Sequence, residues 1–363
     1  MDKKTVVVGM SGGVDSSVAA LLLKEQEYDV IGITMQIWPE SAAPHEGGCC
    51  GVSAAADARL VAEKIGIPFY VIDFTEIFKE KVIDYFTASY LKGLTPNPCI
   101  ACNRYVKWDA LLAKARSIGA DYIATGHYAR IAQLESGRLA VRNSVTAAKD
   151  QTYALYNLTQ EQLSRTLFPV GDHTKDEIRS IAEKASLPVA NKPDSQEICF
   201  VPDGDYAGYI ESEMKAVNKP LPPKGNFVDI SGNVIGIHEG ITHYTIGQRR
   251  GLNIAAGHRV FVTDIKPETN EVVIGENEEL FTTEVICTDV NYMAVPELQK
   301  GEKLRVRAKI RYNHSGEEGE IEALDGGRII CRFDKPVRAA TPGQALVFYT
   351  DECVAGGGTI IKG

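Results

Sequence analysis

The sequence predicts an α/β protein in which a doubly wound parallel sheet precedes two small β-barrel domains. Up to about residue 130, short apolar segments alternate with longer segments whose apolar residues recur at helical spacing. From about residue 205, short strand-like segments alternate with turn residues. A chain of 363 residues has room for two or three domains. We expect them at 1–205, 206–283 and 284–363.

The spacing of apolar residues also places the individual elements. In the first domain we expect strands at 6–8, 30–35, 69–72 and 122–126, and helices at 16–24, 54–65, 77–90, 107–118 and 175–186. Ligands of such a sheet bind beyond the carboxyl ends of its strands. Ser11, Met35 and Gly126 follow strands, so we expect them to line one crevice. In the barrels we expect strands at 227–230, 259–262, 271–274, 304–312, 328–333 and 345–349, with a break near 287–292.

A glycine-rich turn, Ser11–Ser17, separates the first strand from the first helix. Such a turn directs backbone N–H groups and the positive end of the helix dipole at an anion. No lysine follows the glycines, so the run is not a Walker-type loop. It resembles the S-G-G-x-D-S loop of ATP pyrophosphatases, which cleave ATP between the α- and β-phosphates. An ordinary glycine turn is the alternative, but the serines and the aspartate in register favour a nucleotide site.

Composition limits the class of protein. The average composition, the lack of a membrane-length apolar run and an N-terminus without a signal-peptide pattern predict a cytoplasmic protein with no membrane partner. The net charge of −9 argues against a globally basic nucleic-acid binder but allows a local basic face. Eight cysteines in a cytosolic chain indicate metal binding, catalysis or burial rather than structural disulfides.

Further motifs follow the loop in a specific order. They are Asn97–Asn103, Gly126–Tyr128, Lys149–Tyr153, Asp194–Phe200 and Thr245–Gly251. Together with the loop, this series resembles the bacterial tRNA-specific 2-thiouridylases over essentially the whole chain. That family thiolates the wobble uridine in the anticodon arm of certain tRNAs. The resemblance implies an ATP-pyrophosphatase fold and a reaction in which ATP, with magnesium, adenylates the uracil 2-oxygen before sulfur displaces AMP.

The resemblance also implies the site residues. Cys199 would carry the sulfur as a persulfide, and Cys102 would attack that persulfide or form a disulfide with Cys199 after transfer. A sulfur donor, such as a cysteine desulfurase or a sulfur-relay protein, would load Cys199. The implied ATP contacts are Gly9, Met10, Ser11, Gly12, Gly13, Val14, Asp15, Ser16, Met35 and Gly126. The implied tRNA contacts are Asn97, Pro98, Cys99, His127, Lys149, Asp150, Gln151, Arg311, Tyr312 and Gln344.

One residue departs from the family pattern. Cys99 stands where well-known members have an aspartate that is proposed as an acid/base group, and it forms a C-x-x-C with Cys102. With Cys199 as a third ligand, these cysteines would suit an iron–sulfur cluster with one open iron. The persulfide relay and the cluster both remain open. Cys102 is expected just before a helix, which would lower the pKa of its thiol. Cys49 and Cys50 are interpreted as loop residues without an assigned role.

The segment Lys303–Tyr312 carries the most direct signal for RNA. Strand alternation places its cations on one face and its apolar residues on the other. The cations are Arg305, Arg307, Lys309 and Arg311. A row of this kind can follow phosphates. Two other functions stay in view, namely a different ATP-pyrophosphatase ligase and a non-enzymatic, redox-sensing protein that binds ATP and RNA.

Overall fold

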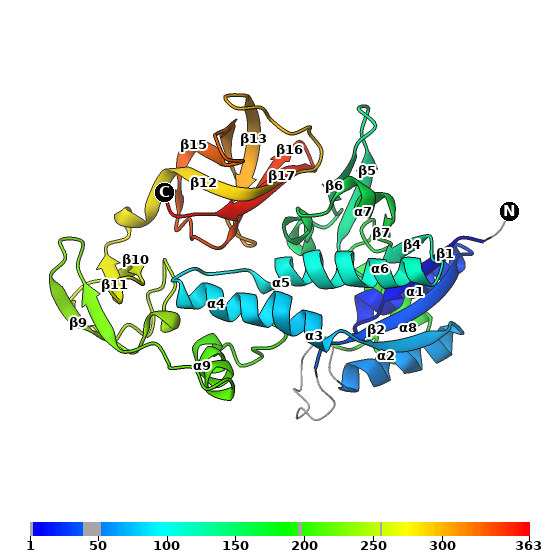
Figure 1. Cartoon of the computed structure of the whole chain (residues 1–363). Coiled ribbons are helices and arrows are strands. Elements are labelled where there is room, and N and C mark those ends of the chain that lie inside the picture. The colour runs from blue at the N-terminus through cyan, green and yellow to red at the C-terminus, as the bar shows by residue number, and fades with distance from the viewer. Residues whose placement is uncertain (1–2, 39–51, 195–197, 255) are drawn as a thin grey trace.

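A computed structural model describes residues 3–38, 52–194, 198–254 and 256–363 (Figure 1). Its N-terminal sheet has five parallel strands in the order β3-β2-β1-β4-β7. Their bounds are β1 Thr5–Gly9, β2 Asp29–Gln36, β3 Phe69–Asp73, β4 Tyr122–Ala124 and β7 Thr166–Leu167. The strand order reverses between β1 and β4, and ligands bind at such switch points. The predicted doubly wound parallel sheet is confirmed.

Side-chain alternation on β1 divides the helices between the two faces of this sheet. Val6 and Val8 pack with α1 Val14–Glu25, α2 Val52–Ile65 and α8 Lys175–Lys184. Val7 faces the opposite core, which contains two long helices. Each of these helices has a π-helical middle. One comprises α3 Thr75–Phe78, η1 Lys79–Asp84 and α4 Tyr85–Leu91, and the other comprises α5 Pro98–Ala101, η2 Cys102–Leu111 and α6 Leu112–Ser117.

The middle of the chain forms a separate four-stranded sheet in the order β10-β11-β8-β9, with its own apolar core around Phe227 and Val272. Its strands are β8 Gly225–Val228, β9 Val234–His238, β10 Phe261–Lys266 and β11 Glu271–Gly275. The helix α9 Tyr206–Ala216 leads into it. Shorter elements are η3 Ala147–Lys149, η4 Thr152–Leu155, α7 Gln160–Ser164, η5 Ile241–His243 and η6 Glu278–Leu280.

The C-terminal strands close into a barrel in the order β12-β15-β14-β13-β16-β17, because β12 also pairs with β17. They are β12 Phe281–Tyr292, β13 Lys303–Lys309, β14 Glu317–Ala323, β15 Ile329–Arg338, β16 Ala345–Thr350 and β17 Cys353–Ile360. β12 runs through 287–292, where the sequence suggested a break. The strand is continuous there but irregular, because its pairing with β17 shifts register between Thr288 and Asn291, where Asp289 has a φ of +51°.

A hairpin of the first domain extends the barrel sheet. Its strands, β5 Ala129–Gln133 and β6 Leu139–Asn143, join the sheet through the pairing of Arg142 with Cys353. An ion pair between Arg142 and Glu352 (2.5 Å) reinforces the junction. The core under the parallel sheet also contains Val347 and Tyr349 of the barrel. The barrel is therefore packed against the N-terminal domain rather than tethered to it.

Candidate active site

The Ser11 loop occupies the switch point between β1 and β4. Its geometry is fixed locally, since the Ser11 N–H donates to Ser16 Oγ (3.1 Å) and Ser17 Oγ donates to the Gly13 carbonyl (2.7 Å). Gly13 occupies the N-cap of α1, and no side chain of the described residues caps that end. The N–H groups in the first turn of a 12-residue helix are therefore available to an anion.

Two glycines allow the loop to pack closely. Gly12 has φ +67°, and a Cβ there would lie 2.3 Å from the carbonyl oxygen of Ala54 on α2. A Cβ on Gly126, which follows β4, would lie 2.6 Å from the backbone nitrogen of Ser16. Because neither position has a side chain, the loop packs directly against α2 on one side and against the segment after β4 on the other.

We expect Gly12→Ala to lower the free energy of unfolding by at least about 1–2 kcal/mol and to weaken ATP binding. The left-handed φ is strained for alanine, and the new methyl would collide with backbone. Chemical denaturation and equilibrium ATP binding measure the two effects. Gly119→Ala is the control, because Gly119 shares a positive φ (+83°) but has open space around its Cβ position. Equal effects of the two substitutions would contradict the close packing.

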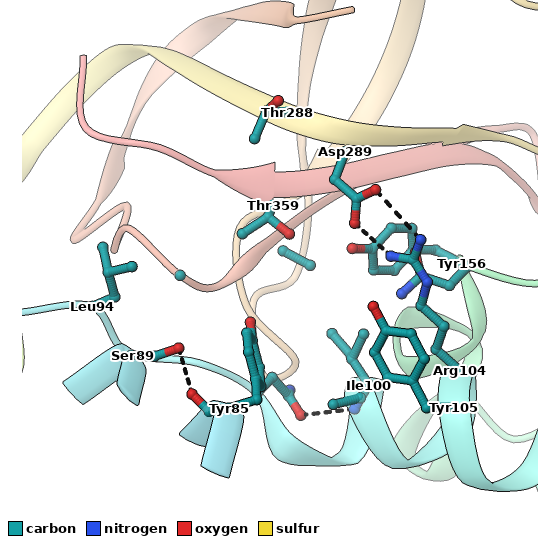
Figure 2. Close-up of a pocket in the computed structure, with 15 residues that line it drawn as sticks. Tyr85, Ser89, Leu94, Ile100, Arg104, Tyr105, Tyr156, Thr288, Asp289 and Thr359 are labelled. Carbon is teal, nitrogen blue, oxygen red and sulfur yellow. Dashed lines mark hydrogen bonds and ion pairs between the residues drawn. The ribbon is translucent and has the colours of Figure 1, made fainter. Parts of the chain in front are cut away.

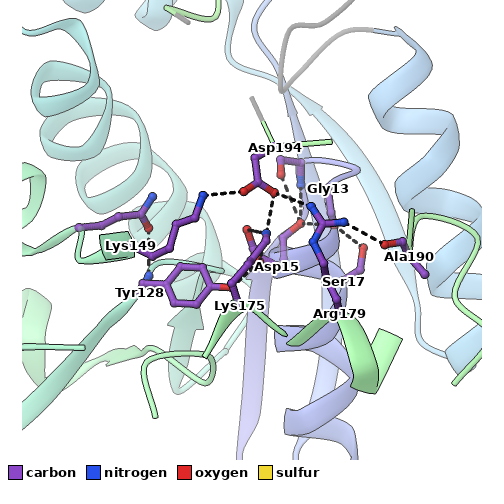
Figure 3. Close-up of polar contacts among 12 residues, drawn as sticks. Gly13, Asp15, Ser17, Tyr128, Lys149, Lys175, Arg179, Ala190 and Asp194 are labelled. Atoms are coloured by element: carbon purple, nitrogen blue, oxygen red, sulfur yellow. Dashed lines mark hydrogen bonds and ion pairs between the residues drawn. The ribbon is translucent and has the colours of Figure 1, made fainter. Parts of the chain in front are cut away.

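Charged residues gather beside the loop (Figure 3). Asp15 accepts hydrogen bonds from the Tyr128 hydroxyl (2.8 Å) and from Lys175 Nζ (2.8 and 2.9 Å). Lys175 also pairs with Asp194 (2.7 Å), as do Lys149 (2.8 Å) and Arg179 (3.3 Å). Partial burial opposes ionisation of Asp194, but hydrogen bonds from Lys149 and Lys175 keep its pKa below the ordinary value. The network links the nucleotide loop to the chain that leads toward Cys199.

His127 follows Gly126 and lies next to Lys107, a residue of the helix that carries Cys102. Its Nδ1 is 2.7 Å from Thr125 Oγ1, and its Nε2 is 3.5 Å from Lys107 Nζ. Burial, and secondarily the positive charge of Lys107, lower the pKa of His127 well below 6.5. The imidazole is therefore neutral at physiological pH.

This shift predicts a loss of stability in acid. The unfolded chain binds a proton near pH 6.5 that folded His127 resists, so stability falls as pH decreases below that value, by at most about 1.4 kcal/mol per pH unit. Burial is also the main reason why the pKa values of His238 and His314 are lowered. His127→Gln should therefore flatten the pH dependence of urea unfolding between pH 7.5 and 5.5 without abolishing it. An unchanged slope would contradict a neutral His127.

Cys99 and Cys102 share one helix, whereas Cys199 lies on a separate loop. The helix begins at Pro98, earlier than expected, because Asn97 caps it by accepting from the Cys99 and Ile100 N–H groups. Cys102 therefore lies inside the helix, and Cys99 occupies the first turn. Cys99 is exposed, and the other two are partly buried.

Among the residues with described positions, no three His, Cys, Asp or Glu side chains gather as a metal site. The three cysteines thus do not form the ligand set that a cluster would need. Cys49 and Cys50 lie outside the described residues, as do residues 195–197 of the Asp194–Phe200 motif.

Several of the predicted tRNA contacts lie where the barrel meets the N-terminal domain. The Tyr312 hydroxyl donates to the Asp150 carbonyl (3.1 Å), and Gln344 Nε2 donates to the Thr95 carbonyl (2.8 Å), close to Asn97. Gln151 accepts from the Tyr128 N–H (2.9 Å). Arg311 donates to the carbonyl of Arg338 (2.7 Å). Tyr312 remains 41% exposed, so its ring is accessible from solvent.

The cationic row on β13 is less available than its sequence suggested. The alternation is as predicted, with Val306 and Ala308 buried. However, β14 places Glu320 opposite Arg305 and Glu318 opposite Arg307, and Asp334 pairs with Arg305. Carboxylates therefore interleave with the row and offset much of its charge.

A pocket of about 270 Å³ lies between the helices and the barrel (Figure 2). Ile100 and Arg104 line it from the cysteine helix, and Arg104 forms an ion pair with Asp289 on β12. Neither Cys99 nor Cys102 is among the described residues that line it. Cys99 and Cys102 therefore lie outside the lining of this pocket.

Known proteins match the chain throughout. The profile described as "tRNA methyl transferase HUP domain" matches residues 4–203, "tRNA methyl transferase PRC-barrel domain" matches 215–276, and "Aminomethyltransferase beta-barrel domain" matches 282–360. A Lachnoclostridium phytofermentans protein named tRNA-specific 2-thiouridylase MnmA is 60% identical, covering 99% of this chain and 100% of the relative. The chain belongs to the tRNA-specific 2-thiouridylase family. A Clostridium acetobutylicum 2-thiouridylase MnmA is 57% identical, again over 99% of this chain and 100% of the relative.

Membership in the 2-thiouridylase family confirms the resemblance seen in the sequence and the barrel prediction for both later domains. The structure adds site residues that the sequence did not single out. Lys175 and Arg179 reach the loop network from α8, and Lys192 donates to the Gly12 carbonyl (3.1 Å) and pairs with Asp57 (2.7 Å). The sequence could have indicated Lys175, because it is the first residue of a capped helix that follows the last parallel strand. In the described part of the chain, no helix is both long and apolar enough to span a membrane.

Proposed function

We propose that this protein catalyses ATP-dependent 2-thiolation of the wobble uridine of tRNA in the cytoplasm. One observation carries the proposal: a helix N-terminus without a side-chain cap at the sheet switch point, in a chain 60% identical over nearly its full length to a 2-thiouridylase. The family uses ATP with magnesium. Asp15 supplies a carboxylate beside the loop that suits the metal, which would neutralise phosphate charge when bound.

The first step forms an adenylate. The uracil 2-oxygen attacks the α-phosphorus of ATP, the bond to the β-phosphate oxygen breaks, and the uracil loses its N3 proton. Pyrophosphate leaves with a charge that the loop N–H groups can stabilise. Lys175, 12% exposed and held by Asp15, is the cation beside this leaving group.

The second step replaces oxygen with sulfur. The terminal sulfur of a Cys199 persulfide attacks C2, and AMP leaves with the former uracil oxygen. The Cys102 thiolate then attacks the Cys199 sulfur, which forms a Cys102–Cys199 disulfide and releases the thiocarbonyl. Alternatively, Cys102 attacks first and releases hydrosulfide, which then attacks C2. In both routes two external thiol groups reduce the disulfide through a mixed disulfide, and they leave as a disulfide of their own. Both routes use the sulfur atoms of Cys102 and Cys199 alone.

The tRNA is proposed to lie over Tyr312, Asp150 and Asn97, where the barrel adjoins the cysteine helix. The experiment is to incubate the protein with ATP, a cysteine desulfurase, cysteine and unmodified tRNA, and to measure 2-thiouridine by mass spectrometry. We expect 2-thiouridine at the wobble position with ATP and none with α,β-methylene-ATP. Its absence with a competent sulfur donor would overturn the proposal.

A further inference from the structure

Phe200, the residue after Cys199, lies in an aromatic cluster and so fixes the loop that carries the cysteine. Phe200 is 2% exposed, and its ring packs against Phe86 (5.2 Å between centroids), Tyr209 (5.1 Å) and Phe78 (6.0 Å). Cys199 and Tyr209 both pack against this same core. Tyr209, on α9, therefore lies beside the sulfur-carrying loop.

The Tyr209 hydroxyl is buried and has no hydrogen bond of ordinary geometry to any residue that the structure describes, although the Glu213 carboxylate lies close enough to interact with it. Buried phenols normally have a partner, so this group needs an explanation. The groups that act on it electrostatically are Glu213, Cys199 and Asp84. Burial, and then these neighbours, raise the pKa of Tyr209, which keeps the phenol protonated and able to donate. Glu213, one turn further along α9, is the competing acceptor.

We propose that the Tyr209 hydroxyl donates a hydrogen bond to the terminal sulfur carried by Cys199, and so holds this sulfur for transfer. The inference rests on the proposed function, since it requires a persulfide on Cys199. Negative charge develops on the terminal sulfur when Cys102 breaks the S–S bond, in either order of steps. A donor at that atom stabilises the charge, and its proton stays on Tyr209 throughout.

The test is single-turnover transfer from protein carrying ³⁵S on Cys199, with label in tRNA and pyrophosphate release measured separately. We expect Tyr209→Phe to slow sulfur transfer about tenfold and to leave pyrophosphate release unchanged. Its melting temperature should be equal or higher, because the substitution removes a buried hydroxyl that lacks a well-formed hydrogen bond. A merely structural role would not separate the two rates.

Tyr206→Phe is the matched control on the same helix. The Tyr206 hydroxyl donates to the His243 carbonyl (3.1 Å), so its loss should lower the melting temperature without slowing sulfur transfer. Glu213→Gln should also transfer sulfur normally. Wild-type rates in Tyr209→Phe, or equal slowing by Glu213→Gln, would overturn the inference alone. A wild-type protein that transfers no label would overturn the persulfide route and this inference with it.

Discussion

Replacing Cys199 with serine is expected to lower the rate of tRNA thiolation by at least about a thousandfold. The proposed route needs a sulfur that can hold a second sulfur, and a hydroxyl cannot form a persulfide. The Ser11 loop and the barrel surface are untouched, so pyrophosphate release and tRNA affinity should stay within about twofold of wild type, as expected for sites without shared partners. Thiolation, pyrophosphate release and filter binding on one preparation measure the three quantities.

Cys353→Ser is the matched control for this substitution. Cys353 is also partly buried, but it lies on β17, in the strand that pairs with β6. The Cys353→Ser variant should thiolate tRNA at the wild-type rate. Thiolation that survives in Cys199→Ser would contradict the role of this cysteine, whatever the stability of the variant.

Replacing Lys175 with methionine should slow pyrophosphate release about 100-fold. The loop has no lysine of its own, and Lys175 is the cation that touches Asp15. Methionine preserves much of the side-chain length but removes the charge that would face the leaving group. Asp194 would keep Lys149 and Arg179, so the network should survive around it. Rapid-quench measurement of pyrophosphate with saturating ATP and tRNA isolates this step.

Lys184→Met, at the exposed far end of α8, controls for the loss of one positive charge. It should release pyrophosphate at the wild-type rate. If Lys175→Met also does so, Lys175 serves the fold rather than the leaving group.

The sequence was most informative where structure is local. The Ser11 loop combines a strand, a glycine turn and a helix start within a few residues, and the structure has each of them. The start of the cysteine helix was predicted too late, although Asn97 followed by Pro98 is a recognisable helix start.

Contacts between distant segments were not predictable from local patterns. Glu318 and Glu320 lie on a strand that the sequence analysis did not identify, so their pairing with the β13 cations was not foreseen. Tertiary packing also determines the pairing of β6 with β17. It likewise brings Lys149 and Lys175 to Asp194. Domain boundaries and the roles of the site residues remain predictions.

In the proposed reaction, the loop places AMP on the uracil 2-oxygen, so that sulfur displaces it. The most direct measurement uses tRNA whose wobble uridine carries oxygen-18 at position 2, in a single turnover with unlabelled ATP. One labelled AMP is expected for each 2-thiouridine formed, because the uracil oxygen leaves with the α-phosphate. Unlabelled AMP accompanying 2-thiouridine would contradict it.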